Sequence, residues 1–142
     1  MAEHAWDESL DKLLTEGRLG VLATLKRDGR PQLSNVTYRY DGDTIRVSVT
    51  DDRAKTKNLR RDPRASLHVS TKDGWGYAVA EGTADLSAVA RDPHDEAVEE
   101  LIELYRDVQG EHPDWDEYRA AMVHDKRLVL RLRVEKVYGW VR

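Results

Sequence analysis

The chain has 142 residues, the length of one domain, and 35% of them are charged. It contains no cysteine, which excludes disulfides, thiol nucleophiles and cysteine metal sites. No apolar run reaches the ~20 residues that span a bilayer, and the first ten residues lack a signal-peptide pattern, so we expect a cytoplasmic protein with no membrane partner. A net charge of −4 argues against a general nucleic-acid binder.

The first fifty residues predict a helix followed by strands. Leucine spacing favours a helix over 7–16, and alternating or β-branched residues favour strands over 18–25, 32–40 and 44–50. Asp-Gly pairs at 28–29 and 41–42 are hairpin signals. We therefore expect a helix and then a three-stranded antiparallel meander.

The rest of the chain predicts a second group of strands with a helix pair before the last one. A short helix over 53–61 should end at Asp62-Pro63, and strands should follow over 65–70 and 77–86. Asp92 as N-cap and Pro93 as first residue open a helix to 109. The last two predicted elements are a helix over 114–124 and a strand over 127–137. Short strands without a parallel crossover rhythm predict a single α+β domain over residues 1–142, a mainly antiparallel barrel with peripheral helices.

Charge is uneven along the chain, and this suggests an anion site. Residues 51–64 hold six Lys or Arg against three Asp, whereas residues 91–116 hold ten acidic residues against two Arg. A phosphate site at the start of the 53–61 helix would combine free amides with Arg53, Lys55 and Lys57, assisted by Thr56 and Asn58. The alternative is a solvated charged loop.

Two further segments have the composition of a ligand site, each with a structural alternative. The polar stretch Gln32-Leu33-Ser34-Asn35-Val36 suits a strand that offers donors to a ligand, or an ordinary solvent-facing edge. Trp75 and Tyr77, beside two glycines, suit contact with a flat ring, or a tight hairpin that covers the barrel end.

Metal and hydrolytic chemistry find little support in the sequence. The five histidines form no pair at metal-ligand spacing, and no Gly-x-Ser-x-Gly motif occurs, so we expect no metal site and assign no catalytic acid or base. The stripe Trp115, Tyr118, Met122 is interpreted as core or interface packing rather than a ligand site.

The order of motifs resembles a known superfamily. R-x-K-x-x-N-L-R-R-D-P-R-A-S-L at Arg53–Leu67 and G-W-G-Y-A-V-A-E-G-T-A at Gly74–Ala84 resemble the FMN-binding split β-barrel proteins, the superfamily of pyridoxamine 5′-phosphate oxidase. G-R-P-Q-L-S-N-V at Gly29–Val36 and V-Y-G-W at Val137–Trp140 are similar to its coenzyme F420-dependent oxidoreductases.

The resemblance implies a split β-barrel homodimer that binds coenzyme F420, a deazaflavin, at the subunit interface. Arg53, Lys55 and Lys57 would hold the cofactor's phosphate and acidic tail, with Thr56 and Asn58 assisting. The other implied cofactor-binding residues are Gln32, Ser34, Asn35 and Val36 along the ring's edge, Ser48 beside the ring, and Trp75 and Tyr77 from the partner subunit or a facing strand. The open side of the barrel would meet the partner, and Leu128, Leu130, Leu132 and Val134 are expected to be buried there.

The function that follows is an oxidoreductase that passes a hydride between the deazaflavin and a small conjugated acceptor, its small-molecule substrate. Three alternatives remain open at this point. They are an FMN-dependent pyridoxamine 5′-phosphate oxidase-like enzyme, a non-catalytic deazaflavin carrier, and a barrel that binds single-stranded nucleic acid through the basic segment. The net negative charge counts against the last, so we expect no nucleic-acid partner.

Overall fold

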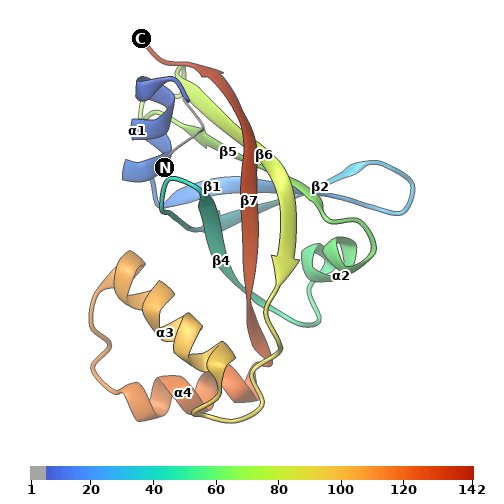
Figure 1. The fold of residues 1–142 in the computed structure, drawn as a ribbon, viewed down its shortest axis with the longest axis vertical. Coiled ribbons are helices and arrows are strands. Elements are labelled where there is room, and N and C mark those ends of the chain that lie inside the picture. The colour runs from blue at the N-terminus through green and yellow to red at the C-terminus, as the bar shows by residue number, and fades with distance from the viewer. Residues whose placement is uncertain (1–5) are drawn as a thin grey trace.

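A computed structural model describes residues 6–142, so the first five residues of the predicted domain lie outside the described part. One sheet of seven strands carries four helices at its edges and ends (Figure 1). The helices are α1 (Glu8–Glu16), α2 (Ala54–Arg61), α3 (Glu96–Gln109) and α4 (Trp115–His124). The strands are β1 (Leu19–Leu25), β2 (Pro31–Thr37), β3 (Arg39–Tyr40), β4 (Thr44–Thr50), β5 (Arg64–Ser70), β6 (Tyr77–Leu86) and β7 (Arg127–Trp140).

The strand order is β2-β1-β5-β6-β7-β4-β3, with antiparallel pairing between all neighbours. The curled sheet is a split barrel, as the resemblance implies (Figure 1). The expected meander is wrong, because β2 pairs with β1 at one edge while β3 and β4 lie at the other edge. Only Tyr38 separates β2 from β3. Its ring is buried and its hydroxyl donates to the carbonyl of Leu14 at 2.7 Å, so the chain crosses the barrel seam there.

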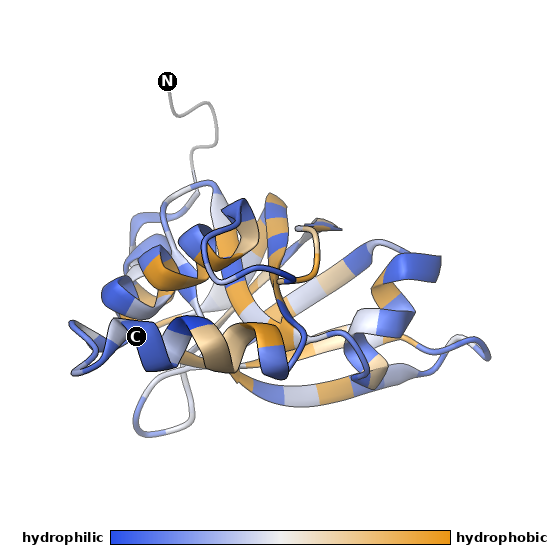
Figure 2. Cartoon of the chain, turned by 90° about the horizontal axis from the view of Figure 1, so that it is seen from below, coloured by the Kyte–Doolittle hydropathy of each residue, from blue (hydrophilic) through white to orange (hydrophobic). Residues whose placement is uncertain are grey.

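Hydrophobic and hydrophilic residues alternate along the strands (Figure 2). The strands bury one face in the barrel interior, as this alternation predicts. The largest contribution comes from the last strand, where Leu128, Leu130, Leu132 and Val134 are buried with Leu14 of α1 in one core cluster. The expectation that these four residues meet a partner is therefore wrong. They alternate because they fill the interior of their own chain, and β7 is a central strand flanked on both sides.

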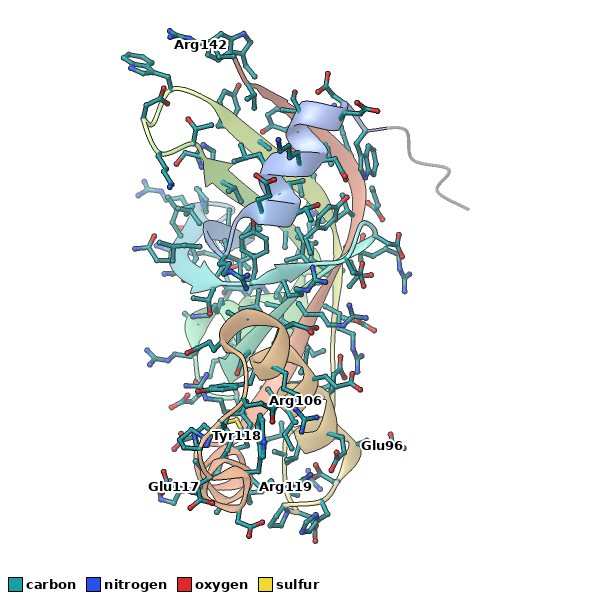
Figure 3. The ribbon with its side chains drawn as sticks, turned by 90° about the vertical axis from the view of Figure 1, so that its left-hand side faces the viewer. Glu96, Arg106, Glu117, Tyr118, Arg119 and Arg142 are labelled. Carbon is teal, nitrogen blue, oxygen red and sulfur yellow. The ribbon has the colours of Figure 1, made fainter. Side chains whose placement is uncertain are left out.

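Helices α3 and α4 pack together at one end of the sheet and form a second core cluster against Val129 (Figures 1 and 3). The predicted start of α3 is wrong by three residues, since Asp95, not Asp92, caps it. The Asp95 carboxylate accepts the backbone N–H of Val98 at 2.9 Å and also those of Arg91 and Asp92. This triple acceptance makes Asp95 the stronger cap.

A cluster of charged side chains attaches α3 to the sheet. Arg46 and Arg131 lie opposite each other on β4 and β7, and Glu100 of α3 lies between them. Arg131 donates to the two carboxylate oxygens of Glu100 at 2.8 and 2.5 Å. These contacts lower the pKa of Glu100, first through the hydrogen bond from Arg131 and then through the charges of Arg131 and Arg46.

Among residues 6–142, no helix is long and apolar enough to cross a membrane. Within the same range, no group of three His, Asp or Glu side chains has an arrangement that could hold a metal ion.

Candidate functional site

Three cationic side chains gather where β4 ends, α2 begins and β7 begins. Arg53 is the N-cap residue of α2 and Lys55 lies in its first turn, while Arg127 opens β7. The register of β4 and β7 places Arg127 opposite Thr50, and its guanidinium reaches the hydroxyl of Ser48 at 3.3 Å. The pKa of Lys55 is lowered by burial and, to a smaller degree, by the charges of Arg53 and Arg127. We call Arg53, Lys55 and Arg127 the cation cluster.

The cation cluster has no carboxylate partner within ion-pair distance in the described part of the chain. Asp51 and Asp52 line the same hollow as Arg53, and the pKa of Asp52 is lowered first by the Thr50 hydroxyl and to a smaller degree by the charges of Arg53 and Lys57. The direct side-chain contacts of the two acids are with other groups. Asp51 pairs with Arg60 at 2.6 Å, and Asp52 accepts the Thr50 hydroxyl at 2.8 Å. Positive charges that the protein itself leaves unpaired suit an external anion.

Arg53 and Arg127 line a hollow of about 810 Å³. Its wall combines the β4–α2 junction, residues 50–54, with the α4–β7 turn, residues 124–127. Lys126 in that turn has a φ of 54°, the left-handed conformation that reverses the chain between helix and strand. The turn thereby brings Arg127 to the basic segment, from which it is more than sixty residues distant in sequence.

The structure brings Arg53 and Lys55 together, as predicted, but separates them from Lys57. Lys57 lines a different hollow of about 530 Å³ with Arg27, Arg60 and Arg61. Helical geometry explains the difference, because residues two apart on a helix differ by about 200° in direction. The prediction of a common side for the three cations treated this turn as if it were extended.

Thr56 and Asn58 make contacts inside the protein rather than in the cation cluster. Both are buried, and the Thr56 hydroxyl donates to the carbonyl of Thr50 at 2.7 Å. The Asn58 amide donates to Thr24 of β1 at 3.1 Å. These bonds attach α2 to the sheet and so fix the direction of the cations.

The predicted ring-edge residues lie on β2, an edge strand of the sheet. The side chains of Gln32 and Ser34 are half-buried, Asn35 is exposed, and Val36 belongs to the core. An edge strand leaves backbone N–H and C=O groups unpaired on its outer side, so β2 has such groups to offer, and their contact with a cofactor ring stays a prediction.

A second cavity, of about 270 Å³, adjoins the first and shares Arg127 and Asp125 with it. Ser48, singled out from the sequence, lines this cavity. The helix pair contributes apolar and aromatic residues to its walls, and Thr37, Gln109 and Asp125 add polar groups. The apolar and aromatic residues include Leu101, Leu104, Tyr105, Tyr118 and Met122. Sequence reasoning missed both Arg127 and this cavity. The sequence shows only that an arginine begins the predicted last strand. This does not indicate a site until it is known that the strand pairs with β4.

Trp75 and Tyr77 lie far from the cation cluster of the same chain. The β5–β6 hairpin that carries Trp75 is at the end of the molecule beside the C-terminus, whereas α2 is on one side of the sheet (Figures 1 and 3). Trp75 is 74% exposed, and Tyr77 stacks on His68 with centroids 5.5 Å apart. Within one chain the structure therefore does not bring these two rings to the cations.

Comparison with known protein families identifies the family to which this sequence belongs. The family described as pyridoxamine 5′-phosphate oxidase matches residues 6–141. The chain belongs to this family. The match agrees with the split barrel and with the sequence resemblance, and it covers the cation cluster, β2 and the second cavity.

Individual relatives extend the comparison. A Mycobacterium tuberculosis protein named F420H(2)-dependent biliverdin reductase is 29% identical over 128 residues, 89% of this chain and 82% of that protein. A solved structure of an F420 reductase superposes with a TM-score of 0.70 at 23% identity, covering 94% of this chain and 98% of that one. The heme storage protein HutZ of Vibrio cholerae superposes with a TM-score of 0.69 at 15% identity, covering 93% and 92%. These structures share the fold with this chain.

Proposed function

We propose that this protein is an oxidoreductase that uses coenzyme F420 to transfer a hydride to or from a small conjugated acceptor. The observation that carries the proposal is the cation cluster, which has no carboxylate within ion-pair distance among residues 6–142 and two of whose members, Arg53 and Arg127, line a hollow of about 810 Å³. The family match and the relative named for F420H(2) support it.

The residues present fit the anionic part of such a cofactor. Arg53 and Lys55 would hold its phosphate and acidic tail, and Arg127 adds to the positive potential. Gln32, Ser34, Asn35 and Val36 would contact the ring's edge through β2, partly with backbone groups, and Ser48 would lie beside the ring. When bound, the deazaflavin supplies the hydride-carrying carbon, and the chain supplies orientation and exclusion of water.

FMN is the alternative cofactor, because a cationic phosphate site suits both molecules. Absorbance titration of the purified protein with F420 and with FMN distinguishes them. We expect F420 to bind at least tenfold more tightly. Tighter binding of FMN, or of hemin in a parallel titration, would overturn the proposed cofactor.

Turnover separates an enzyme from a carrier. Reduced F420 should be reoxidised faster with protein and a conjugated acceptor together than with either alone, over a panel of quinones, enones and tetrapyrroles. Tight F420 binding without protein-dependent reoxidation across the panel would establish a carrier instead.

A homodimer is part of this proposal, supported by an apolar outer face of the sheet. The strand registers place Leu19, Leu33, Tyr77, Tyr138 and Trp140 on the face opposite the barrel core. Leu19 and Leu33 are 65% and 60% exposed. Exposed large apolar side chains gathered on one sheet face favour association, and a second copy would bring its Trp75 and Tyr77 to the site.

Light scattering tests the assembly, with an expected mass of twice 16.3 kDa. Leu33→Asp should shift the protein toward the monomer, whereas Leu130→Asp would unfold the barrel. A cofactor-binding monomer at micromolar concentration would contradict the dimer and the shared site together.

A further inference from the structure

The second cavity lies between the helix pair and the sheet, and its lining differs in kind from that of the cation cluster. Leu101, Leu104, Tyr105 and Val108 contribute from α3 at spacings of three and four residues, so they share one helix face. Tyr118 and Met122 contribute from α4. The cavity therefore has one apolar wall from each helix.

Aromatic rings are prominent in this lining and are held rigidly. The rings of Tyr105 and Tyr118 meet edge to face with centroids 5.0 Å apart, and Trp115 packs against both from behind. The Tyr118 hydroxyl is already used, since it donates to the carbonyl of Leu101 at 3.1 Å. The tyrosines thus offer ring surfaces to a ligand, and such surfaces favour a flat, unsaturated partner.

Two charged side chains line this cavity, Arg127 and Asp125. The Asp125 carboxylate lies 3.2 Å from the ring of the neighbouring His124, so Arg127 is the cation that this lining presents to a ligand. Arg127 is half-buried and its guanidinium carries five N–H donors, yet within the described part of the chain it makes a single hydrogen bond, of 3.3 Å, to the hydroxyl of Ser48. Burial raises the pKa of Tyr118 to about 12, and the positive charge of the nearby Arg127 opposes that rise. A planar guanidinium with free donors is suited to a carboxylate.

We infer that this cavity binds a small, flat, conjugated or aromatic carboxylic acid, with its carboxylate on Arg127 and Ser48 and its ring between Tyr105, Tyr118 and Met122. The volume of about 270 Å³ lies just below the range typical of drug-sized ligands, which favours one or two rings. A whole linear tetrapyrrole exceeds it.

The inference rests on the proposed function for one point only, the role of this ligand. Ser48, which the proposed function puts beside the deazaflavin ring, lines this cavity, so the occupant of the cavity would be the hydride acceptor. Reduction would add a hydride from the reduced deazaflavin and a proton from water across one conjugated double bond. Binding of the acid requires no cofactor and can be tested alone.

The test compares 2-naphthoate with its neutral analogue 2-naphthamide by calorimetry on the cofactor-free protein. The parent should bind the acid about tenfold more tightly than the amide, the lower end of the range for hydrogen bonds to a charged group. Arg127→Gln should bring the two affinities within twofold. Arg133→Gln, which removes an exposed arginine of the same strand, should keep the tenfold preference.

A second variant and a spectroscopic readout locate the ligand. Val108→Trp fills the cavity and should weaken both the acid and the amide about tenfold, while F420 affinity stays within twofold. Methyl NMR signals of Leu101, Leu104 and Met122 should shift on addition of naphthoate. Thermal melts confirm that each variant is folded.

Several results would overturn the inference. Equal affinity for acid and amide, an unchanged preference in Arg127→Gln, or unshifted methyl signals would each do so. Binding of F420 without binding of naphthoate would contradict this inference and leave the proposed function standing. Binding of naphthoate without binding of F420 would contradict the proposed function and leave the carboxylic-acid site standing.

Discussion

Arginine side chains lie in two regions along the β4–β7 strand pair, and the two regions differ in whether a carboxylate neutralises them. Toward α3, Arg46 and Arg131 face each other across the strands, and Glu100 neutralises them. Near α2, Arg127 is joined by Arg53 and Lys55 with no carboxylate in ion-pair range among the described residues. Like charges that face each other destabilise a sheet unless a counter-charge is present. The first region therefore supports the fold, and the second is available to a ligand.

The largest effect is expected when a charge is removed from the cation cluster. Lys55→Ala should weaken F420 binding by about 1.5–3 kcal/mol, the range for a hydrogen bond to a charged group, without lowering the free energy of unfolding. Titration at several ionic strengths should also show weaker binding as salt rises. If Lys55→Ala and Arg53→Ala both bind F420 as the parent does, the anion site is elsewhere.

The matching change in the paired region should affect stability instead. Glu100→Gln leaves Arg46 and Arg131 facing each other without a counter-charge, and it should lower the free energy of unfolding by about 1–2 kcal/mol. Urea denaturation measures this, with Glu103→Gln on the exposed side of α3 as control. A fall in F420 affinity beyond twofold would show that the two regions are not separate.

Low pH should reduce the difference in unfolding free energy between the parent protein and Glu100→Gln. The pKa of Glu100 is lowered in the folded protein, so its ionised form stabilises the fold above the ordinary value of 4.5, and this contribution is lost as pH falls toward the lowered value. The gap in unfolding free energy between the parent and Glu100→Gln should therefore narrow below pH 4.5. A gap that stays constant from pH 6 to pH 3 would assign the effect to packing.

The smallest expected effect has the opposite sign. Burial and two neighbouring cations lower the pKa of Lys55, which means that its charged form is disfavoured in the cofactor-free fold. Lys55→Met should raise the free energy of unfolding by about 0.5–1 kcal/mol, as is common when a functional charge is replaced. A destabilised variant in thermal melts would show that Lys55 has an internal partner.

Local sequence patterns predicted most elements but not their neighbours. Alternation located β4 to the residue, and the Arg53–Lys55 pair was found because helix starts and cations favour anions. Strand order could not be found in this way. The separation of β2 from β3 depends on the burial of Tyr38 against α1, a contact between residues 24 apart in sequence.

The same limit applies to the site. Arg127 joins the cation cluster only because β7 lies beside β4, and Lys57 leaves it because the segment is already helical at that point. Pairing between distant strands and the exact start of a helix are long-range or cooperative properties. A single sequence does not fix either of them.

The position of β7 has a consequence for biosynthesis. It is the last strand to leave the ribosome, yet it lies between β6 and β4. Until it emerges, β3 and β4 form only a two-stranded ribbon, and Ile45, Val47 and Val49 lack the leucines against which they pack. A nascent chain that stalls before residue 127 therefore carries two additional open sheet edges, those of β6 and β4, and an unfilled barrel, the kind of intermediate that aggregates or recruits chaperones. Folding of this domain has to wait for its final strand.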